Sequence, residues 1–462
     1  MKHTKILFIL ALGIFLNSCE DAIYIDPQDE ITDSNAITNV ADLQAAATGT
    51  YAFISGAGEI ELSAYISDEN KIAPTNNGQG VQINNWTFVD NESDVQGYWS
   101  GNYQLVARAN SVLTQMGKIT AANATEQAAL DRVKGEMLGL RAFGHFNLLR
   151  LFATSYTDLN ALAVAYVTRP IVTEKLPRIT VGEFYTLLNK DLDESASLLD
   201  NNSRTSNGYI TSDFVTAIKA RIALYKKDYA NAYALSNKLI TSGKYQLAQN
   251  QSEFDEIWND GAGDKETIFK VKRLTGQSAI GAIFTATDGA TVYLNPSNKL
   301  VRSYKSDDLR LTSYLSTDKT QVNKYPGTTQ LYLNDIKIFR ISEMYLIRAE
   351  ASANTGNLVS ASADFNAVAK LRQPAFVDYT FASVNDATTN LLQERFREFA
   401  FEGHRFFDLK RTATDITRDS DDCAAIQNAA CTLPASNFRF TMPIPSAERD
   451  VNPGLQQNPG YN

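Results

Sequence analysis

Three glutamates spaced four residues apart are the first candidates for acid–base chemistry. Glu394, Glu398 and Glu402 recur in a segment rich in phenylalanine and arginine. On a helix this spacing places three carboxylates on one face, and a hydrolase can use a carboxylate pair as general acid and base. The arginines close enough in sequence to pair with them are Arg395, Arg397, Arg405 and Arg411. Because buried carboxylates need such partners, Arg–Glu pairs that lock the helix are the commoner explanation.

The sequence contains no familiar catalytic motif. It has no G-x-S-x-G nucleophile elbow, no G-x-x-x-x-G-K-[ST] phosphate loop and no H-E-x-x-H metal pair. His404 could serve as a base, but nothing near it in sequence has the pattern of a nucleophile. The Gly-x-Gly pairs that begin at Gly56 and Gly261 do not continue into a dinucleotide-binding motif. We therefore expect a protein that is not an enzyme and has no catalytic residue and no cofactor.

Aromatic side chains in polar, aperiodic stretches are the candidates for ligand binding. Trp86 follows Ile83-Asn-Asn, and Tyr65, Tyr293 and Tyr325 also lie outside the strong helical patterns. Sugar rings have apolar C–H faces that stack on aromatic rings, while polar neighbours orient the hydroxyl groups. Core packing is the competing explanation for each of the four residues, and it is weakest for Trp86. We predict exposed loop aromatics at a saccharide site, with Trp86 as the first residue to test.

The N-terminus has the pattern of an exported and lipidated protein. Basic residues precede an apolar run from Ile6 to Leu16, which is too short to span a bilayer. Leu16-Asn17-Ser18-Cys19 also resembles the bacterial lipobox, in which the cysteine is lipidated and becomes the first residue. The alternative is an ordinary cleaved signal with an incidental cysteine. We predict a lipoprotein signal peptide over 1–18 and a lipidated tether over 19–39, so that acyl chains on Cys19 anchor the chain without spanning the membrane.

Two cysteines remain near the C-terminus, and they are eight residues apart. In an exported protein, Cys423 and Cys431 suggest a short disulfide loop. A metal role fits less well, because both histidines beyond the signal peptide are distant in sequence. The acidic run Asp419–Asp422 could hold calcium, but it lacks the spacing and terminal glutamate of an EF-hand loop. We predict a disulfide and no metal site.

The composition fits a large folded protein and excludes one class of partner. The 462 residues could hold more than one domain, and 44% hydrophobic with 10% aromatic residues are enough for a packed core. The formal net charge is −9, and Lys and Arg are spread along the chain without a basic run. Nucleic acid is therefore not an expected partner.

Two helical hairpins are the elements that must position these residues. The first runs from Arg340 to Arg372 and turns at Gly356, where a helix C-cap favours positive φ. Small residues at Ala349 and Ala361 let its two helices approach closely, as a tetratricopeptide pair requires. The same intervals recur upstream at Ala220, Lys227 and Ala232. Two pairs in register favour a helical-repeat scaffold, which binds partners more often than it performs chemistry; two unrelated hairpins are the alternative.

The rest of the chain alternates between helical and irregular stretches. The stretch 56–97 breaks into Gly, Asn and Asp and is predicted as a long loop, which is uncommon unless it is functional. Thr267–Lys272 alternates like a strand. Further helices are predicted over residues 40–53, 98–112, 126–152, 180–199 and 389–403.

Several of these segments together resemble the SusD/RagB family. They follow the family's order over essentially the whole mature chain, and Glu402 to Arg411 is the most specific of them. Besides the lipobox, the segments are Tyr98-Trp99 with Tyr103 and Ala109-Asn110, Leu140–Phe143, Leu149–Phe152, Arg178–Val181, Arg340–Ala351, Glu394–Arg411, Pro443–Pro445, Asn452-Pro453 and Asn458–Tyr461.

The resemblance implies a fold, a location and a role. The fold is all-α, with tetratricopeptide-like helix pairs in an α–α superhelix and an irregular, loop-rich ligand-binding part. It places the domain at 40–462, with an N-terminal SusD-like part over about 40–230 and a C-terminal RagB/SusD part over about 255–462. Family members are non-catalytic lipoproteins of the outer membrane, and acidic residues just after the lipidated cysteine, here Glu20 and Asp21, are similar to signals for surface export.

The same resemblance implies partners but no contact residues. Family members capture an oligo- or polysaccharide and deliver it to a SusC-like TonB-dependent transporter, which they cover like a lid. Their ligand contacts are not part of the shared motifs, so no binding residue carries over to this chain. Two alternatives stay open: a structural lid with little ligand affinity of its own, and a binder of a non-glycan nutrient such as peptide.

Overall fold

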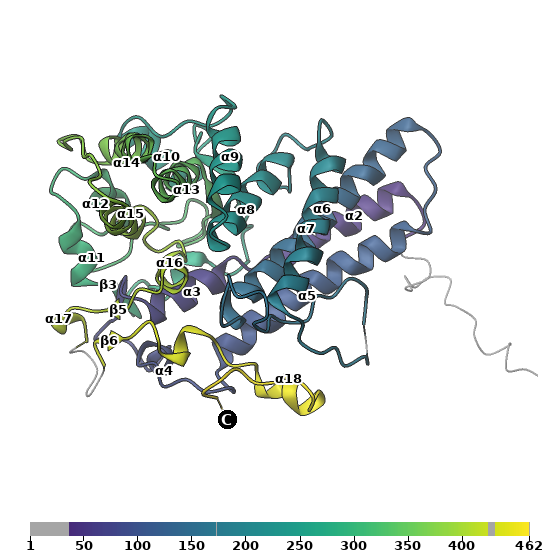
Figure 1. The fold of residues 1–462 in the computed structure, drawn as a ribbon, viewed down its shortest axis with the longest axis horizontal. Coiled ribbons are helices and arrows are strands. Elements are labelled where there is room, and N and C mark those ends of the chain that lie inside the picture. The colour runs from purple at the N-terminus through teal and green to yellow at the C-terminus, as the bar shows by residue number, and fades with distance from the viewer. Residues whose placement is uncertain (1–36, 172, 424–429, 462) are drawn as a thin grey trace, which may run out of the picture.

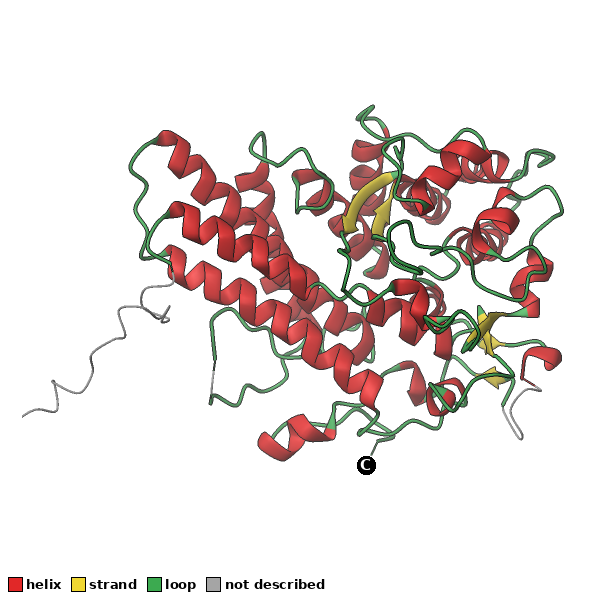
Figure 2. Cartoon of the chain, turned by 180° about the vertical axis from the view of Figure 1, so that it is seen from behind, coloured by secondary structure: helices red, strands yellow, loops and turns green. Residues whose placement is uncertain are grey.

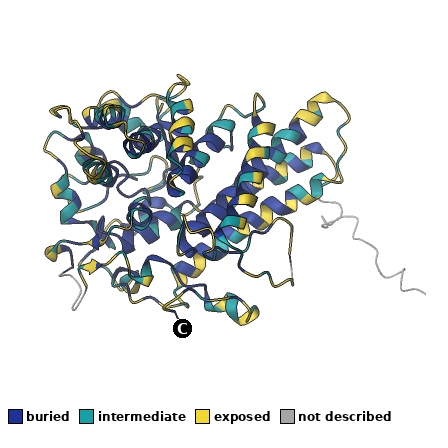
Figure 3. Cartoon of the chain, viewed as in Figure 1, coloured by how far each residue is buried: buried dark blue, intermediate teal, exposed yellow. Residues whose placement is uncertain are grey.

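Long helices of the N-terminal half form one arm of the molecule (Figure 1). The computed structural model describes residues 37–171, 173–423 and 430–461. The arm contains α2 (Val40–Thr50), α5 (Ser93–Met116), α6 (Ala124–Phe152) and α7 (Val181–Leu199). Their buried faces meet inside the bundle and their polar faces point to solvent (Figure 3). The predicted signal peptide, Cys19 and most of the predicted tether lie outside the described residues.

The two predicted hairpins are present and stack on each other. They are α8 (Ser212–Tyr225) with α9 (Tyr229–Ile240) and α13 (Ile341–Asn354) with α14 (Leu358–Arg372), and α9 packs along α13. Lys227 has a φ of 59° at the turn where the second hairpin has Gly356 at 88°. The small residues that let the helices approach are all fully buried: Ala220, Ala232, Ala349 and Ala361. The prediction of tetratricopeptide-like helix pairs is confirmed.

Shorter elements surround these pairs and form the second half of the molecule (Figure 2). The short helices are α3 (Ala57–Ile66), α4 (Val81–Asn84), α10 (Gln251–Trp258), α11 (Asn298–Ser303), α12 (Leu309–Tyr314), α15 (Val384–Glu398), α16 (Arg405–Thr412), α17 (Ser420–Cys423) and α18 (Ser446–Val451). Single 3-10 turns occur at η2 (Tyr51–Phe53), η3 (Ile280–Ile283) and η4 (Phe438–Phe440). Among the described residues, no helix is both long and apolar enough to cross a membrane.

The strands of the described chain form three two-stranded antiparallel sheets. They pair β1 (Asn70–Ile72) with β3 (Leu294–Pro296), β2 (Thr267–Val271) with β4 (Ile336–Arg340), and β5 (Ile416–Thr417) with β6 (Thr432–Leu433). The first sheet joins segments far apart in sequence, because Ile72 pairs with Leu294. It therefore brings the residues that precede β3 beside the end of α3.

Several predicted boundaries were wrong, and two of them affect the site. The predicted loop 56–97 contains α3, which is buried on nearly every side and so lacks the one-sided apolar pattern that marks an amphipathic helix. The helix predicted over 389–403 instead ends at Glu398. Phe401 and Gly403 then adopt positive φ, and a Cβ at Gly403 would lie 2.8 Å from the backbone carbon of Glu59 in α3. The chain turns there so that α16 can pack against α3.

Candidate ligand-binding site

The three glutamates are structural, but their partners are mostly not the nearby arginines. Glu398 accepts from Arg340 at 2.8 Å, from Arg372 at 3.0 Å and from Arg310 at 3.3 Å. These arginines come from β4, α14 and α12, and all of them are buried. The other two glutamates belong to the same cluster, in which Glu394 pairs with Arg310 and Arg397, and Glu402 with Arg340 and Lys324.

His404 lies beside this cluster and is partly buried. Burial, together with the positive charges of Arg221 and Arg395, holds the pKa of His404 well below its ordinary value. Its ring stacks on Phe399, with 4.5 Å between ring centroids. The neutral imidazole therefore packs against Phe399. The Glu394–His404 segment joins α15, α16 and α3, which is a structural role.

Two of the four predicted aromatics line one pocket of about 430 Å³. Tyr65 comes from α3, and Tyr293 immediately precedes β3. The β1–β3 pairing brings them together, because the Ala73 amide donates to the carbonyl of Tyr293 at 3.1 Å. The other walls are the loop from Gly78 to Gln82, the start of α5 and the end of η3.

The hydroxyl groups of both tyrosines are available in this pocket. Tyr65 is only 3% exposed, yet its hydroxyl forms no hydrogen bond with any described residue, and neither does that of Tyr293. Gly80, with a φ of 64°, lies over the Tyr65 ring so closely that a Cβ would come within 2.2 Å of it. A glycine at position 80 is therefore required for the loop to cover the ring and leave the hydroxyl facing the pocket.

Carboxylates line the same pocket, and sequence reasoning missed them. Glu61 lies on α3 and Asp94 in the first turn of α5; both are half-buried, and Glu92 is close by. Burial and the neighbouring charge of Asp94 raise the pKa of Glu61 to about 7, and burial raises that of Asp94. One weak signal was available in the sequence: Glu61 stands between the apolar residues Ile60 and Leu62, with no basic residue near it.

Trp86, Tyr325 and Tyr65 are all buried, so the prediction of exposed loop aromatics is wrong for these three, although Tyr65 still lines the pocket. Trp86 is 4% exposed, its indole N–H donates to the Ile66 carbonyl at 2.9 Å, and the Arg418 guanidinium lies over its ring. Tyr325 is 3% exposed and donates to the Phe401 carbonyl at 3.0 Å. Trp86 instead binds the end of α3 through the Ile66 carbonyl. Because Ile66 directly follows Tyr65, this contact helps to hold Tyr65 in place.

A second, larger cavity of about 630 Å³ lies between α5, the stretch around residues 165–176 and α18. Several of its polar groups are already engaged within the protein. The Tyr103 hydroxyl donates to the Ala165 carbonyl, Arg169 pairs with Glu174, and the Asn452 amide donates to the Leu176 carbonyl. The smaller pocket, with its free hydroxyls and carboxylates, offers more groups to orient a polar ligand.

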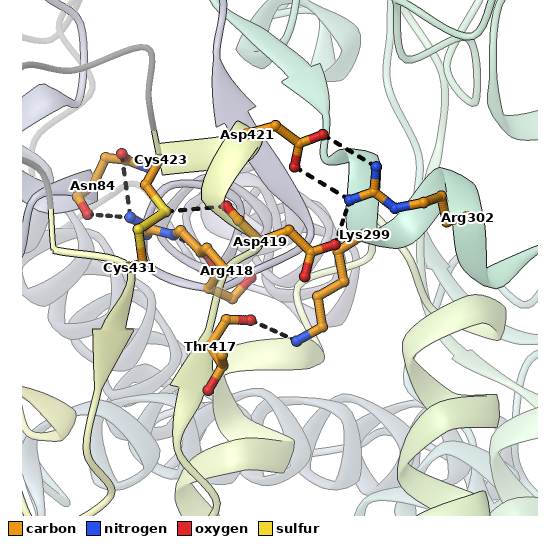
Figure 4. The surroundings of a disulfide bond; sticks show 10 residues. Asn84, Lys299, Arg302, Thr417, Arg418, Asp419, Asp421, Cys423 and Cys431 are labelled. Atoms are coloured by element: carbon orange, nitrogen blue, oxygen red, sulfur yellow. Dashed lines mark hydrogen bonds and ion pairs between the residues drawn. A yellow bond between two sulfur atoms is a disulfide. The ribbon is translucent and has the colours of Figure 1, made fainter.

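The cysteine pair is joined by a disulfide next to an acidic cluster (Figure 4). Cys423 ends α17 and Cys431 immediately precedes β6, with 5.6 Å between their Cα atoms. The carboxylates of Asp419 and Asp421 face Arg302, as Figure 4 shows. The third carboxylate, of Asp422, accepts from the amides that start α11. Because the protein already satisfies these carboxylates, we assign no metal to the cluster.

Removing the disulfide is expected to lower the free energy of unfolding by about 2 kcal/mol, because the bridge restricts a short loop in the unfolded chain. The comparison is urea unfolding of residues 20–462 against the Cys423→Ser/Cys431→Ser variant. Saccharide binding should be unaffected, since neither cysteine lines the Tyr65 pocket. Reductant should destabilise the parent and leave the double variant unchanged. Equal stability of parent and variant would contradict the expectation.

The fold and the pocket define a helical-repeat binding protein, and comparison with known sequences gives its family. A model of the SusD family matches residues 225–461, and one described as "Starch-binding associating with outer membrane" matches residues 20–224. The chain belongs to the SusD family. This is a family of carbohydrate-binding proteins associated with the outer membrane, and no enzyme family is indicated.

Individual relatives agree with this assignment. "SusD-like protein P38" of Formosa agariphila is 24% identical, over 88% of this chain and 90% of its own. A SusD superfamily protein from Bacteroides thetaiotaomicron is 25% identical, with a TM-score of 0.79 over 91% of this chain and all of its own. A putative sugar-binding protein from Bacteroides vulgatus, 24% identical over 92% of this chain and all of its own, shares the fold with a TM-score of 0.80.

Proposed function

We propose that this protein is a surface-exposed, non-catalytic lipoprotein that captures an oligosaccharide and passes it to a SusC-like TonB-dependent transporter. The family supports carbohydrate binding at the outer membrane. The lipobox supports anchoring through Cys19, and Glu20 and Asp21 support an outward orientation. The helical pairs serve as the scaffold, and the chain divides into the N-terminal and C-terminal parts proposed from its sequence.

The observation that carries the proposal is the pair of free tyrosine hydroxyls in one open pocket. Tyr293 offers aromatic surface to the apolar face of a sugar, and the hydroxyls of Tyr293 and Tyr65 can exchange hydrogen bonds with it. Gln79 and Gln82 add exposed amide groups to the lining. The pocket is open, so much of a bound ligand would remain in solvent. Binding should therefore be reversible, as transfer to a transporter requires.

Tyr293→Ala is expected to weaken saccharide binding at least about tenfold, because it removes the aromatic ring that is open to the pocket. Residues 20–462 would be screened against oligo- and polysaccharides by affinity electrophoresis, and the retained ligand measured by calorimetry. Tyr65→Phe removes only the buried ring's hydroxyl and should weaken binding less. Tyr233→Ala, an exposed tyrosine on α9 outside the pocket, is the matched control and should bind normally.

Each result of this screen has a distinct meaning. Binding that survives both pocket variants would keep the function and discard the pocket as its site. A chain that retains no saccharide at all would favour the structural lid or a non-glycan nutrient.

A further inference from the structure

We propose that the Tyr65 pocket selects saccharides that carry a protonated amino group on the ring, such as glucosamine oligomers, over neutral and acidic saccharides. The inference rests on the proposed function and narrows it to a class of ligand. The pocket combines aromatic surface, free hydroxyls and uncompensated negative charge, and an amino sugar offers the complement of all three.

All of the charged side chains that line the pocket are acidic. Glu61, Glu92 and Asp94 line it, and none of the described residues in its lining is Lys, Arg or His. These three carboxylates form no ion pair with any described residue. Other enclosed carboxylates of this chain do have cations: Asp191 pairs with Arg141, and Glu343 with Arg221, each at 2.6 Å. The pocket therefore repels a uronate or sulfate group and attracts an ammonium group.

The remaining groups favour a sugar ring as the carrier of that ammonium. The Tyr65 side chain is more than nine-tenths buried, and its hydroxyl has no partner in the described chain although it lines the pocket. A hydroxyl held this way is a suitable partner for a sugar hydroxyl. The aromatic ring of Tyr293 would not help to bind a bare metal ion, whereas it matches the apolar face of a pyranose.

Protonation of the carboxylates should control the preference. The groups facing Glu61 are Asp94 and Glu92 from the start of α5, Tyr65 from its own helix and Tyr293 from the strand segment. Burial and the Asp94 charge raise the pKa of Glu61 to about 7, so a bound ammonium group would lower it and release a proton. The amine of the sugar also gains protons over this range, so the parent must be compared with Glu61→Gln at each pH. The affinity of the parent for an amino sugar, relative to that of Glu61→Gln, should fall as pH drops from 7 to 5.5.

The experiment compares a glucosamine tetramer with the N-acetylated tetramer on the full chain purified in detergent, by calorimetry at pH 7. We expect the free-amine tetramer to bind at least about tenfold more tightly. Glu61→Gln and Asp94→Asn should remove that preference, because they weaken binding of the free-amine tetramer more than binding of the acetylated one. Glu194→Gln, an exposed glutamate that pairs with Lys134 on the long-helix arm, is the control. If Glu61→Gln lowers the melting temperature, Glu92→Gln at the same pocket takes its place.

Several results would overturn the inference. Equal affinity for the two tetramers would do so, as would a preference that persists in the Glu61→Gln/Asp94→Asn variant. Tighter binding of calcium alone or of trilysine at these carboxylates would reassign the pocket to a metal ion or a basic peptide. If another saccharide binds and Tyr293→Ala abolishes it, this inference fails while the proposed function stands. If no saccharide binds, both this inference and the proposed function are rejected.

Discussion

Replacing Glu398 by alanine is expected to lower the free energy of unfolding by about 3–5 kcal/mol, because it removes a carboxylate that three buried arginines share and leaves the buried cluster short of one negative charge. The carboxylate is fully buried and accepts hydrogen bonds from Arg310, Arg340 and Arg372. Without Glu398, Arg372 keeps Glu266, which it shares with Arg340. Arg340 also keeps Glu402, and Arg310 keeps Asp308 and Glu394, so the loss falls mainly on Arg372. Because the three arginines come from α12, β4 and α14, the loss should loosen the whole C-terminal half.

Urea unfolding at pH 7 and the melting temperature measure this effect. Glu194→Ala, which breaks an exposed pair with Lys134, should cost at most about 1 kcal/mol and serves as the control. Glu398→Gln keeps the shape but not the charge, so most of the loss should remain. A Glu398→Ala variant as stable as the Glu194→Ala variant would show that the cluster contributes no net stability.

The same cluster sets the direction of the pH dependence. Burial alone would raise the pKa of Glu398, but Arg372, Arg340 and Arg310 outweigh it, and the pKa lies well below its ordinary value. Arg405 and Lys299 likewise lower the pKa of Asp68 against the effect of burial. A group with a lowered folded-state pKa stabilises the fold above its unfolded pKa of about 4, and this contribution is lost as pH falls. The parent should therefore lose stability below about pH 4, and the Glu398→Ala variant should lose less.

Trp86→Ala is expected to cost about 3–5 kcal/mol of folding free energy, as removal of a large buried aromatic does. The indole N–H and the Arg418 guanidinium together hold the C-terminal end of α3. Arg418 donates to the carbonyls of Tyr65, Ile66 and Ser67, and its charge lies 4.2 Å from the Trp86 ring centroid. Without the indole, this end of α3 should shift and carry Tyr65 with it, so saccharide binding should also weaken.

Melting temperature and saccharide affinity, measured on the same samples, separate a supporting role from a contact role. Trp86→Phe keeps much of the buried volume and should lose less than half as much stability as Trp86→Ala, with little change in affinity. If Trp86→Ala left stability intact and abolished binding, the indole would be a direct contact, and its burial in the unbound protein would have to change when the ligand binds.

The sequence by itself determined the family, the fold class and the helical pairs. These depend on local features: apolar spacing, small residues at Ala349 and Ala361, and a turn residue such as Gly356, each of which acts within one hairpin. The helix predicted over 180–199 was equally visible, and in the structure Thr180 caps it and forms a capping box with Glu183. Features that act over a few residues leave a pattern in the chain, so they could be predicted.

Only the tertiary structure decided which residues surround the pocket and which lie in the core. Tyr65 and Tyr293 meet because β1 pairs with β3 across more than two hundred residues, and no local pattern records that pairing. Trp86 has the polar surroundings of an exposed residue, but Arg418 and the end of α3 enclose it. The partners of Glu398 are equally remote. Burial and ion pairing depend on which distant segments the fold brings into contact, so they could be read only from the tertiary structure.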